Sequence, residues 1–233
     1  MTIVDIAKPR PRLSGEARQQ QIVDTVLDLV AKQGADGVSV QAIADRIGLT
    51  QPAVFRHFPN KEAIWVAVMT WLEEQLGAIH QAADASFGES PLIVLKHMFT
   101  QHVRMVERHP ALAKIVFSDH LRLQFPSLQI RFAGIHSAYE RRIVTLLQRA
   151  KIQALVPASL PTNDAATLFL CMIQGLGFQF AIARRPMQLR READQVFALY
   201  LRAITNPPLP KRPSNGHRRR TRPQGKNDKE DQR

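Results

Sequence analysis

Apolar residues recur along most of the chain at the spacing of about 3.6 residues that one face of a helix requires, and no segment alternates as a strand does. In the first such segment, Ile22, Val26 and Leu29 lie on one stripe. This helix is expected to end near Gly34 and Gly37, because glycine takes a left-handed cap at little cost. Prolines punctuate the later helical segments, which are predicted over residues 60–84, 91–108, 111–124, 127–153, 162–184 and 189–204. The pattern therefore predicts an all-α protein.

Residues 39–58, SVQAIADRIGLTQPAVFRHF, have the pattern of two short helices joined by a tight turn. Ser39 can cap the first helix, and Ala44 is small enough for the two helices to cross closely. Gly48 allows the positive φ that the turn needs. A small core is expected from the apolar residues Ile43, Ile47, Leu49 and Val54. This segment is predicted to be a helix-turn-helix.

The second helix of this motif is predicted to begin near Gln51 and to present an outward surface. Thr50 can cap it, and Pro52 falls in its first turn, where the missing N–H is not needed. The residues expected to be largely unburied are Gln51, Pro52, Ala53, Phe55, Arg56 and His57. Such a helix fits the major groove of DNA, which is about 12 Å wide. There Gln51 can pair with an adenine edge, and Arg56 can bind guanine or phosphate.

The run LTQPAVFRHFPNKEAI resembles the signature of TetR-type repressors, and the resemblance covers roughly residues 15–65. It implies an N-terminal three-helix helix-turn-helix DNA-binding domain followed by a larger helical domain for ligand binding and dimerisation. By position, it also implies DNA contacts from Gln41, Thr50, Gln51, Pro52, Ala53, Phe55, Arg56, His57 and Lys61. Phe55 departs from the usual tyrosine, so it lacks one hydroxyl for a phosphate and is expected mainly to pack.

The resemblance and the composition together divide the chain into four parts. We expect a basic flexible arm over residues 1–14, the DNA-binding domain over residues 15–62, and a helical effector-binding and dimerisation domain over residues 63–205. Residues 206–233 hold five prolines and many charges but few large apolar residues, so a disordered basic tail is predicted there.

The formal net charge of +12 lies mostly near the chain ends. Residues 206–233 contribute +6 and residues 1–18 contribute +2, which leaves +4 for the remainder. Bulk charge therefore supports binding to nucleic acid only weakly, and the argument for DNA rests on the motif. The tail either adds non-specific DNA affinity or only solubilises the protein, and the sequence leaves both interpretations open.

The larger domain is expected to hold an effector pocket, because Met, aromatic and a few polar side chains make adaptable apolar cavities. The candidate lining residues are Trp71, Met98, His102, Met105, Phe117, Phe132, His136, Tyr139 and Gln174. For each of these residues, the alternative interpretation is ordinary packing in the hydrophobic core.

The dimer face is expected on the helices at 162–184 and 189–204, where Gly175 and Gly177 permit close approach. The candidate interface residues are Leu168, Phe169, Met172, Gly175 and Phe178. Packing of these residues within their own domain is the alternative interpretation.

Other function classes find little support in the sequence. The single cysteine, Cys171, excludes an internal disulfide, and its neighbours Leu170 and Met172 suggest a buried, inert thiol. The histidine spacings do not favour a metal site, and we expect neither a metal nor a cofactor. We find no glycine-rich phosphate loop and no nucleophile elbow, so an enzyme is not expected. The chain has no pattern of a signal peptide or a membrane span, which suggests a cytoplasmic, nucleoid-associated protein.

These observations predict a DNA-binding transcriptional regulator. We expect a repressor that binds a palindromic operator in double-stranded DNA as a homodimer and is released by a small apolar or amphipathic effector. The alternative is a DNA-bound interaction factor of the same fold, acting at the nucleoid or in cell division without a small-molecule effector.

Overall fold

The structure is a computed structural model that describes residues 13–85, 88, 90–183 and 188–206. Most of the predicted basic arm and all but the first residue of the predicted tail lie outside the described residues. Within the described ranges every regular element is an α-helix. The prediction of an all-α fold is therefore confirmed.

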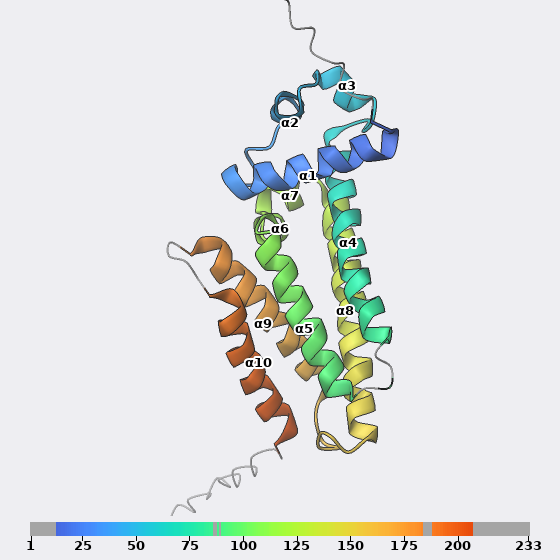
Figure 1. Cartoon of the computed structure of the whole chain (residues 1–233), viewed down its shortest axis with the longest axis vertical. Coiled ribbons are helices and arrows are strands. Elements are labelled where there is room, and N and C mark those ends of the chain that lie inside the picture. Colours follow the sequence, from blue (N-terminus) through green and yellow to red (C-terminus); the bar gives the residue numbers. More distant parts are fainter. Residues whose placement is uncertain (1–12, 86–87, 89, 184–187, 207–233) are drawn as a thin grey trace, which may run out of the picture.

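Three helices form one end of the long axis, which we call the head (Figure 1). They are α1 (Gly15–Gln33), α2 (Val40–Ile47) and α3 (Gln51–Phe55). The backbone N–H of Ala17 donates to the side chain of Ser14, 3.2 Å away, which caps the start of α1. As predicted, α1 ends before Gly34, which has a φ of 82°. In Figure 1, α1 lies across the top of the remaining helices, and α2 and α3 lie beyond it.

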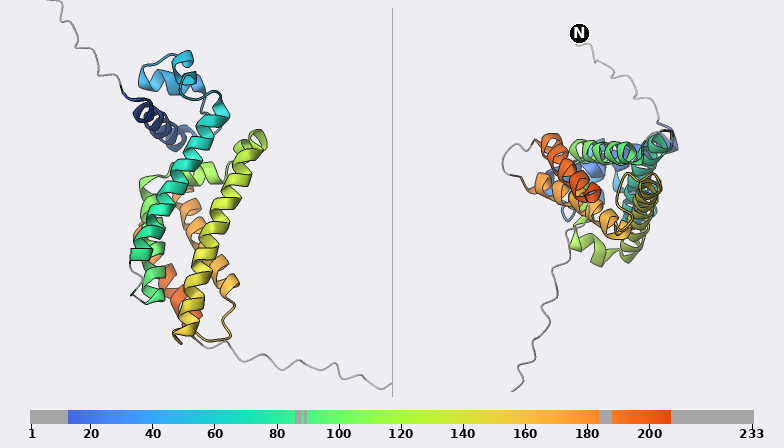
Figure 2. Two further views of the ribbon diagram at one scale, coloured as in Figure 1. Left: turned by 90° about the vertical axis from the view of Figure 1, so that its right-hand side faces the viewer. Right: turned by 90° about the horizontal axis from the view of Figure 1, so that it is seen from below.

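Seven helices form the remainder of the described chain, which we call the body. They are α4 (Lys61–Ala85), α5 (Pro91–Arg108), α6 (Ala111–Val116), α7 (Asp119–Gln124), α8 (Pro126–Ile152), α9 (Thr162–Ile182) and α10 (Leu189–Thr205). Figure 2 shows the long helices α4 and α8 along the same side of the body, and residues of the two helices are in contact.

The body departs from the predicted helices at one point. A single helix was expected over residues 111–124, but α6 ends at Phe117 and α7 begins after Ser118. The Ser118 hydroxyl accepts a hydrogen bond from the N–H of Leu121 at 3.2 Å, so Ser118 starts a new helix instead of continuing the old one.

Aromatic side chains from three helices make up the centre of the body. Phe169 of α9 is fully buried, and its ring packs edge-on against Phe99 of α5 and Tyr200 of α10, with centroids 5.4 and 5.9 Å apart. The Tyr200 hydroxyl donates to the carbonyl of Ala165 at 3.1 Å, so this buried polar group is paired.

By length and composition alone, α9 could cross a membrane, and it is the one helix of the described residues with that property. In the structure it packs against α5, α6, α8 and α10. Only 39% of this apolar window is buried, so packing within the chain covers part of the helix and leaves an apolar side exposed.

Candidate nucleic-acid interface and ligand cavity

The helix-turn-helix forms as its sequence predicts. The Ser39 hydroxyl accepts from the N–H of Ala42 at 3.0 Å and caps α2. Gly48 adopts the left-handed conformation with a φ of 67° and a ψ of 40°, and its N–H bonds to the carbonyls of Ala44 and Asp45. Ala44 has no exposed surface. The turn and the close helix crossing therefore depend on a glycine and an alanine at these two places.

The short helix α3 begins at Gln51, with Pro52 in its first turn, as expected. Thr50 occupies the cap position, but its side chain makes no capping hydrogen bond, so that part of the prediction is wrong. The carbonyl of Thr50 instead accepts from the N–H groups of Ala53 and Val54 at 2.9 and 3.1 Å. Backbone geometry alone therefore starts α3.

Most residues predicted to contact DNA have accessible side chains. Those with exposed side chains are Gln41, Thr50, Pro52, Phe55 and Arg56, and those that are half-buried are Gln51, His57 and Lys61. Ala53 was expected to be unburied as well, but it is 6% exposed. It lies beside buried Val54 on the side of a five-residue helix that packs against α2, so it has little surface left for a base.

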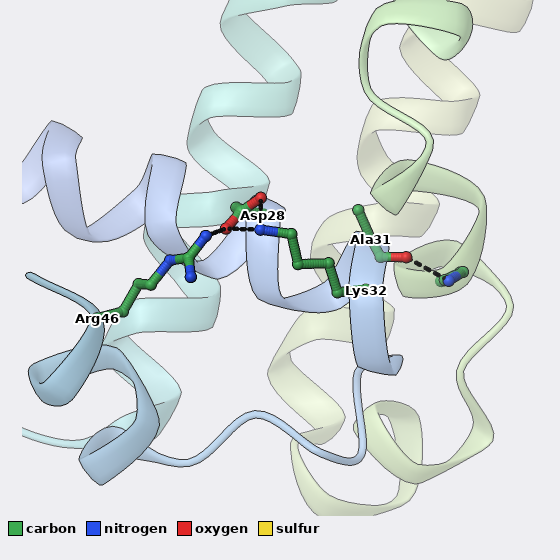
Figure 3. A network of polar contacts seen from close by, with 5 residues as sticks. Asp28, Ala31, Lys32 and Arg46 are labelled. Carbon is green, nitrogen blue, oxygen red and sulfur yellow. Dashed lines mark hydrogen bonds and ion pairs between the residues drawn. The ribbon is translucent and has the colours of Figure 1, made fainter.

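Polar contacts fix the position of α2 and α3 relative to α1. Asp28 of α1 lies between Lys32 and Arg46 and accepts from both, at 2.8 and 2.7 Å (Figure 3). The hydrogen bond from Lys32 is the largest cause of the lowered pKa of the Asp28 carboxyl. The Gln19 amide donates to the carbonyl of His57 at 3.2 Å, just after α3. These exposed contacts contribute little stability each, but they orient the two helices.

The cationic groups near α3 have no ion-pair partner among the described residues. Neither Arg56 nor Lys61 forms an ion pair with any of the described residues. Lys61 is the first residue of α4, where the helix dipole also favours an anion. The Gln41 amide, in contrast, donates to Asp45 along α2, so it has to leave that partner before it can meet a base.

Residues 22–68 match the family model of the bacterial regulatory proteins of the tetR family. Over these residues the chain therefore has a TetR-type DNA-binding domain. The match covers the same helices that carry the cap at Ser39, the left-handed Gly48 and the exposed face of α3. The protein is accordingly a transcriptional regulator with a TetR-type DNA-binding domain.

Two relatives in this family are similar to the chain over longer stretches. The HTH-type transcriptional regulator AcrR of Shigella flexneri is 25% identical over 202 residues, which cover 82% of this chain and 91% of that protein. The nucleoid occlusion factor SlmA of Haemophilus ducreyi is 24% identical over 144 residues, covering 61% of this chain and 71% of that protein.

Solved structures show the same fold. The ketosteroid transcriptional regulator KstR2 of Mycobacterium tuberculosis aligns with a TM-score of 0.67 at 20% identity, covering 84% of this chain and all of that one. The regulator FadR of Bacillus subtilis, solved in complex with stearoyl-CoA, aligns with a TM-score of 0.66 at 19% identity, covering 79% of this chain and 98% of that one.

A cavity of about 90 Å³ lies in the body, lined by residues of α4, α5, α6, α8 and α9 and by Phe117. Seven of the nine residues predicted for a pocket lie in this lining, namely His102, Met105, Phe117, Phe132, His136, Tyr139 and Gln174. Trp71 and Met98 do not line it. Trp71 packs edge-on against His109 with ring centroids 4.8 Å apart, and Met98 is fully buried in the core.

The remaining lining residues were missed because they are aliphatic. Leu72, Leu76, Leu112, Ile135 and Ile173 belong to this group. In the sequence, an aliphatic residue that borders a cavity does not differ from one packed in the core, so no local signal could have distinguished them.

Two polar side chains of the cavity lie in contact with each other. The rings of His102 and Tyr139 pack edge-on with centroids 5.3 Å apart. Nδ1 of His102 and Oη of Tyr139 are buried without a hydrogen-bond partner among the described residues. Burial, with a further contribution from His80, lowers the pKa of His102 to about 4, and burial raises the pKa of Tyr139 above its usual value. Both side chains are therefore uncharged near pH 7.

The candidate dimer residues on α9 fall on two sides of the helix. Leu168, Gly175 and Phe178 are exposed, and Met172 is half-buried. Phe169 is fully buried inside its own chain, so it is a core residue with no surface to offer a partner.

An exposed stripe on α9 follows spacings of three and four residues. It consists of Leu168, Cys171, Gly175, Phe178 and Ile182. The prediction that Cys171 is buried is therefore wrong, since the thiol lies on this exposed stripe. The three-four spacing is visible in the sequence and could have separated Ile182 and Cys171 from the buried side that carries Phe169.

Proposed function

We propose that the chain acts as a homodimeric repressor that binds a palindromic operator, with α3 of each protomer in a major groove. The observation that carries the proposal is α3 itself, which lies at the end of the molecule with Pro52, Phe55 and Arg56 exposed. The charge of Lys61 lies nearby and has no ion-pair partner among the described residues. Two such helices about 34 Å apart, one turn of DNA, would reach successive grooves on one side of the duplex. The protein would then act at the nucleoid in the cytoplasm.

The dimer contact we propose is the exposed stripe on α9, together with the outer side of α10. Leu168, Phe178 and Ile182 of α9 are 48%, 45% and 60% exposed, and Leu199 of α10 is 59% exposed. Large apolar side chains gathered on neighbouring helices are typical of an interface. Leu168→Glu would place a charge in this contact, so we expect a folded protein that sediments as a monomer. A variant that keeps the dimer mass would contradict the proposed face.

We propose the cavity as the effector site, because α6 contributes to its lining and is also hydrogen-bonded to the head. Leu112 and Ala113 of α6 line the cavity. The next residue of the same helix, Lys114, donates a hydrogen bond from Nζ to the carbonyl of Ala31 in α1 at 2.6 Å. Figure 3 shows this contact at the Ala31 carbonyl. A ligand that binds better to a conformation with α6 displaced would therefore move α1 and change the spacing of the two α3 helices.

A second function has support from one relative. SlmA is called a nucleoid occlusion factor, and its similarity to this chain favours a DNA-bound interaction factor with no small-molecule effector. The cavity in the body favours the effector-responsive regulator instead. Release of the bound duplex by a small compound would support the first function. A protein partner retained on the duplex, with no compound that releases it, would support the second.

The test of DNA recognition is selection of duplexes from a random pool by the purified full-length chain. We expect enrichment of an inverted repeat with half-sites about 10 base pairs apart, centre to centre, or a multiple of that spacing. Enrichment of a single, non-repeated site would contradict the dimeric mode, and no enrichment would contradict operator recognition altogether.

A further inference from the structure

We infer that the cavity takes a small neutral molecule that is mostly apolar and carries one hydroxyl group, which bonds to Tyr139 and His102. A phenol or a compact alcohol has this chemistry. The inference deepens the proposed function and depends on it only for the consequence of binding, namely release of DNA.

The size of the cavity limits the ligand. An engineered cavity of about 150 Å³ lined by aliphatic and aromatic side chains binds benzene. The cavity here, at about 90 Å³, is smaller, and most of its lining is Leu, Ile, Val, Met and Phe. The ligand is therefore on the scale of one small ring, with room for larger groups only where side chains move. Phe117 is partly exposed and packs edge-on against Phe178, so its ring has solvent on one side and is the lining side chain we expect to move for a larger group.

The charge of the lining favours a neutral ligand. No Asp, Glu, Lys or Arg side chain borders the cavity. An anion such as a carboxylate would lose its water on entering this space and gain no opposite charge in return. Acyl chains with a free carboxylate and thioesters of charged carriers therefore fit this cavity less well than a neutral ring does.

The need for a hydroxyl follows from the unpaired polar atoms. Oη of Tyr139 and Nδ1 of His102 both belong to lining residues and have no partner among the described residues. Buried polar groups are rarely left in that state. A hydroxyl group can accept the proton of Tyr139 and donate its own to Nδ1 of His102 when the histidine carries its proton on Nε2. One ligand group would then satisfy both atoms.

A second buried tyrosine provides the comparison within the same chain. Tyr200 is as buried as Tyr139, at 2% exposed, but its hydroxyl donates to the carbonyl of Ala165. Tyr200 is not part of the cavity lining. Among the described residues, the buried tyrosine in the packed core therefore has a hydrogen-bond partner, and the one at the cavity has none.

The test compares three methyl-substituted benzene rings by titration calorimetry on the full-length protein: toluene, 4-methylphenol and 4-methylbenzoate. We expect 4-methylphenol to bind about ten-fold more tightly than toluene, the factor that one well-placed hydrogen bond supplies. We expect 4-methylbenzoate to bind more weakly than either. Equal binding of toluene and 4-methylphenol, tighter binding of the benzoate, or no binding of any probe would overturn the inference.

Two matched variants show whether the hydroxyl of Tyr139 causes the preference for 4-methylphenol over toluene. Tyr139→Phe is expected to reduce the preference for 4-methylphenol over toluene, because only the bond to His102 remains, while the stability of the unliganded protein does not fall, because no hydrogen bond is lost. Tyr200→Phe is expected to lower stability and to leave the preference for 4-methylphenol unchanged. If Tyr139→Phe lowered stability as much as Tyr200→Phe and the preference persisted, the hydroxyl would have another partner and the inference would be wrong.

The consequence for DNA is measured separately on the duplex selected above. Binding of 4-methylphenol with release of the duplex supports both the inference and the effector-responsive function. Binding of 4-methylphenol without release supports the ligand chemistry and contradicts the effector-responsive function. Tight duplex binding by a protein that takes up none of the probes contradicts the ligand chemistry alone.

Discussion

The head and the body of this protein place their functional residues in opposite environments. On α3 and at its C-terminal end, Gln51, Pro52, Phe55 and Arg56 are exposed or half-buried, and they lie close together in the sequence. In the body, the cavity is lined by residues from α4, α5, α6, α8 and α9, and of its two adjoining polar side chains Tyr139 is buried and His102 is half-buried. A local sequence pattern can specify the first arrangement, whereas the second requires the whole bundle.

This difference has consequences for variants. A change on α3 is expected to alter binding with little loss of stability, because exposed side chains pack against few neighbours. A change in the body is expected to alter stability first, since close-packed interiors respond even to one lost methylene group.

Removing a central ring of the body is expected to have the largest effect. Phe169→Ala leaves a cavity between Phe99, Phe197 and Tyr200, which we expect to cost about 3–5 kcal/mol of the free energy of unfolding. Urea denaturation measures this loss. Leu123→Ala is the control, because Leu123 is 84% exposed, and we expect a change within about 0.5 kcal/mol. Similar losses for both variants would contradict the central place of Phe169.

The stability of the body is also expected to depend on pH through His102. Its pKa is about 4 in the folded chain and near 6.5 when unfolded, so the unfolded state binds a proton first as the pH falls. Unfolding then becomes easier below pH 6.5, and the loss continues until His102 is protonated in the folded chain near pH 4. Between pH 7 and 5 the free energy of unfolding falls by about 2 kcal/mol through this group.

Denaturation of the wild type and of His102→Gln at several pH values isolates this contribution from that of the carboxylates. We expect the variant to lose less stability than the wild type between pH 7 and 5. Parallel pH curves for the two proteins would show that His102 is not buried in its neutral form.

On the head, two substitutions separate base recognition from phosphate binding. Gln51→Ala is expected to weaken binding to the selected duplex by about 1–3 kcal/mol and to leave binding to scrambled DNA nearly unchanged. Lys61→Ala is expected to weaken both duplexes alike and to reduce the salt dependence of binding. Fluorescence anisotropy titrations at two salt concentrations measure both effects. Equal losses on the two duplexes from Gln51→Ala would contradict its assignment to a base.

The smallest expected effect concerns backbone conformation. Gly48→Ala places a side chain at a φ of 67°, which we expect to cost about 1 kcal/mol of stability. Gly134→Ala, within α8 and with no atom near the added methyl group, is expected to gain up to about 1 kcal/mol. Thermal unfolding measures both changes. The same sign for the two substitutions would contradict the special conformation of Gly48.

Sequence patterns predicted the head in most details because the determinants lie close together along the chain. Ser39, Ala44 and Gly48 each act through neighbours within a few residues, and the structure has them as expected. Ala53 was an exception because its burial depends on which side of a single helical turn meets α2, and Thr50 because the backbone alone starts α3.

In the body, helix positions followed from periodicity, but the role of single residues did not. The break at Phe117 and Ser118 depends on a local cap within an otherwise apolar run. The separation of Phe169 from the exposed stripe depends on the rotation of α9 in the bundle. Tyr200 is paired, and Tyr139 has no hydrogen-bond partner in the described part of the chain, because of the carbonyls that lie nearby, and no local pattern contains that information.

The most direct test of the account is a competition titration at physiological salt with the selected duplex bound to the full-length protein. The account predicts that a large excess of scrambled duplex leaves most of the complex intact, because α3 binds base edges as well as phosphates. If scrambled duplex displaces the selected one as readily as unlabelled selected duplex does, α3 does not recognise sequence, and the account is wrong.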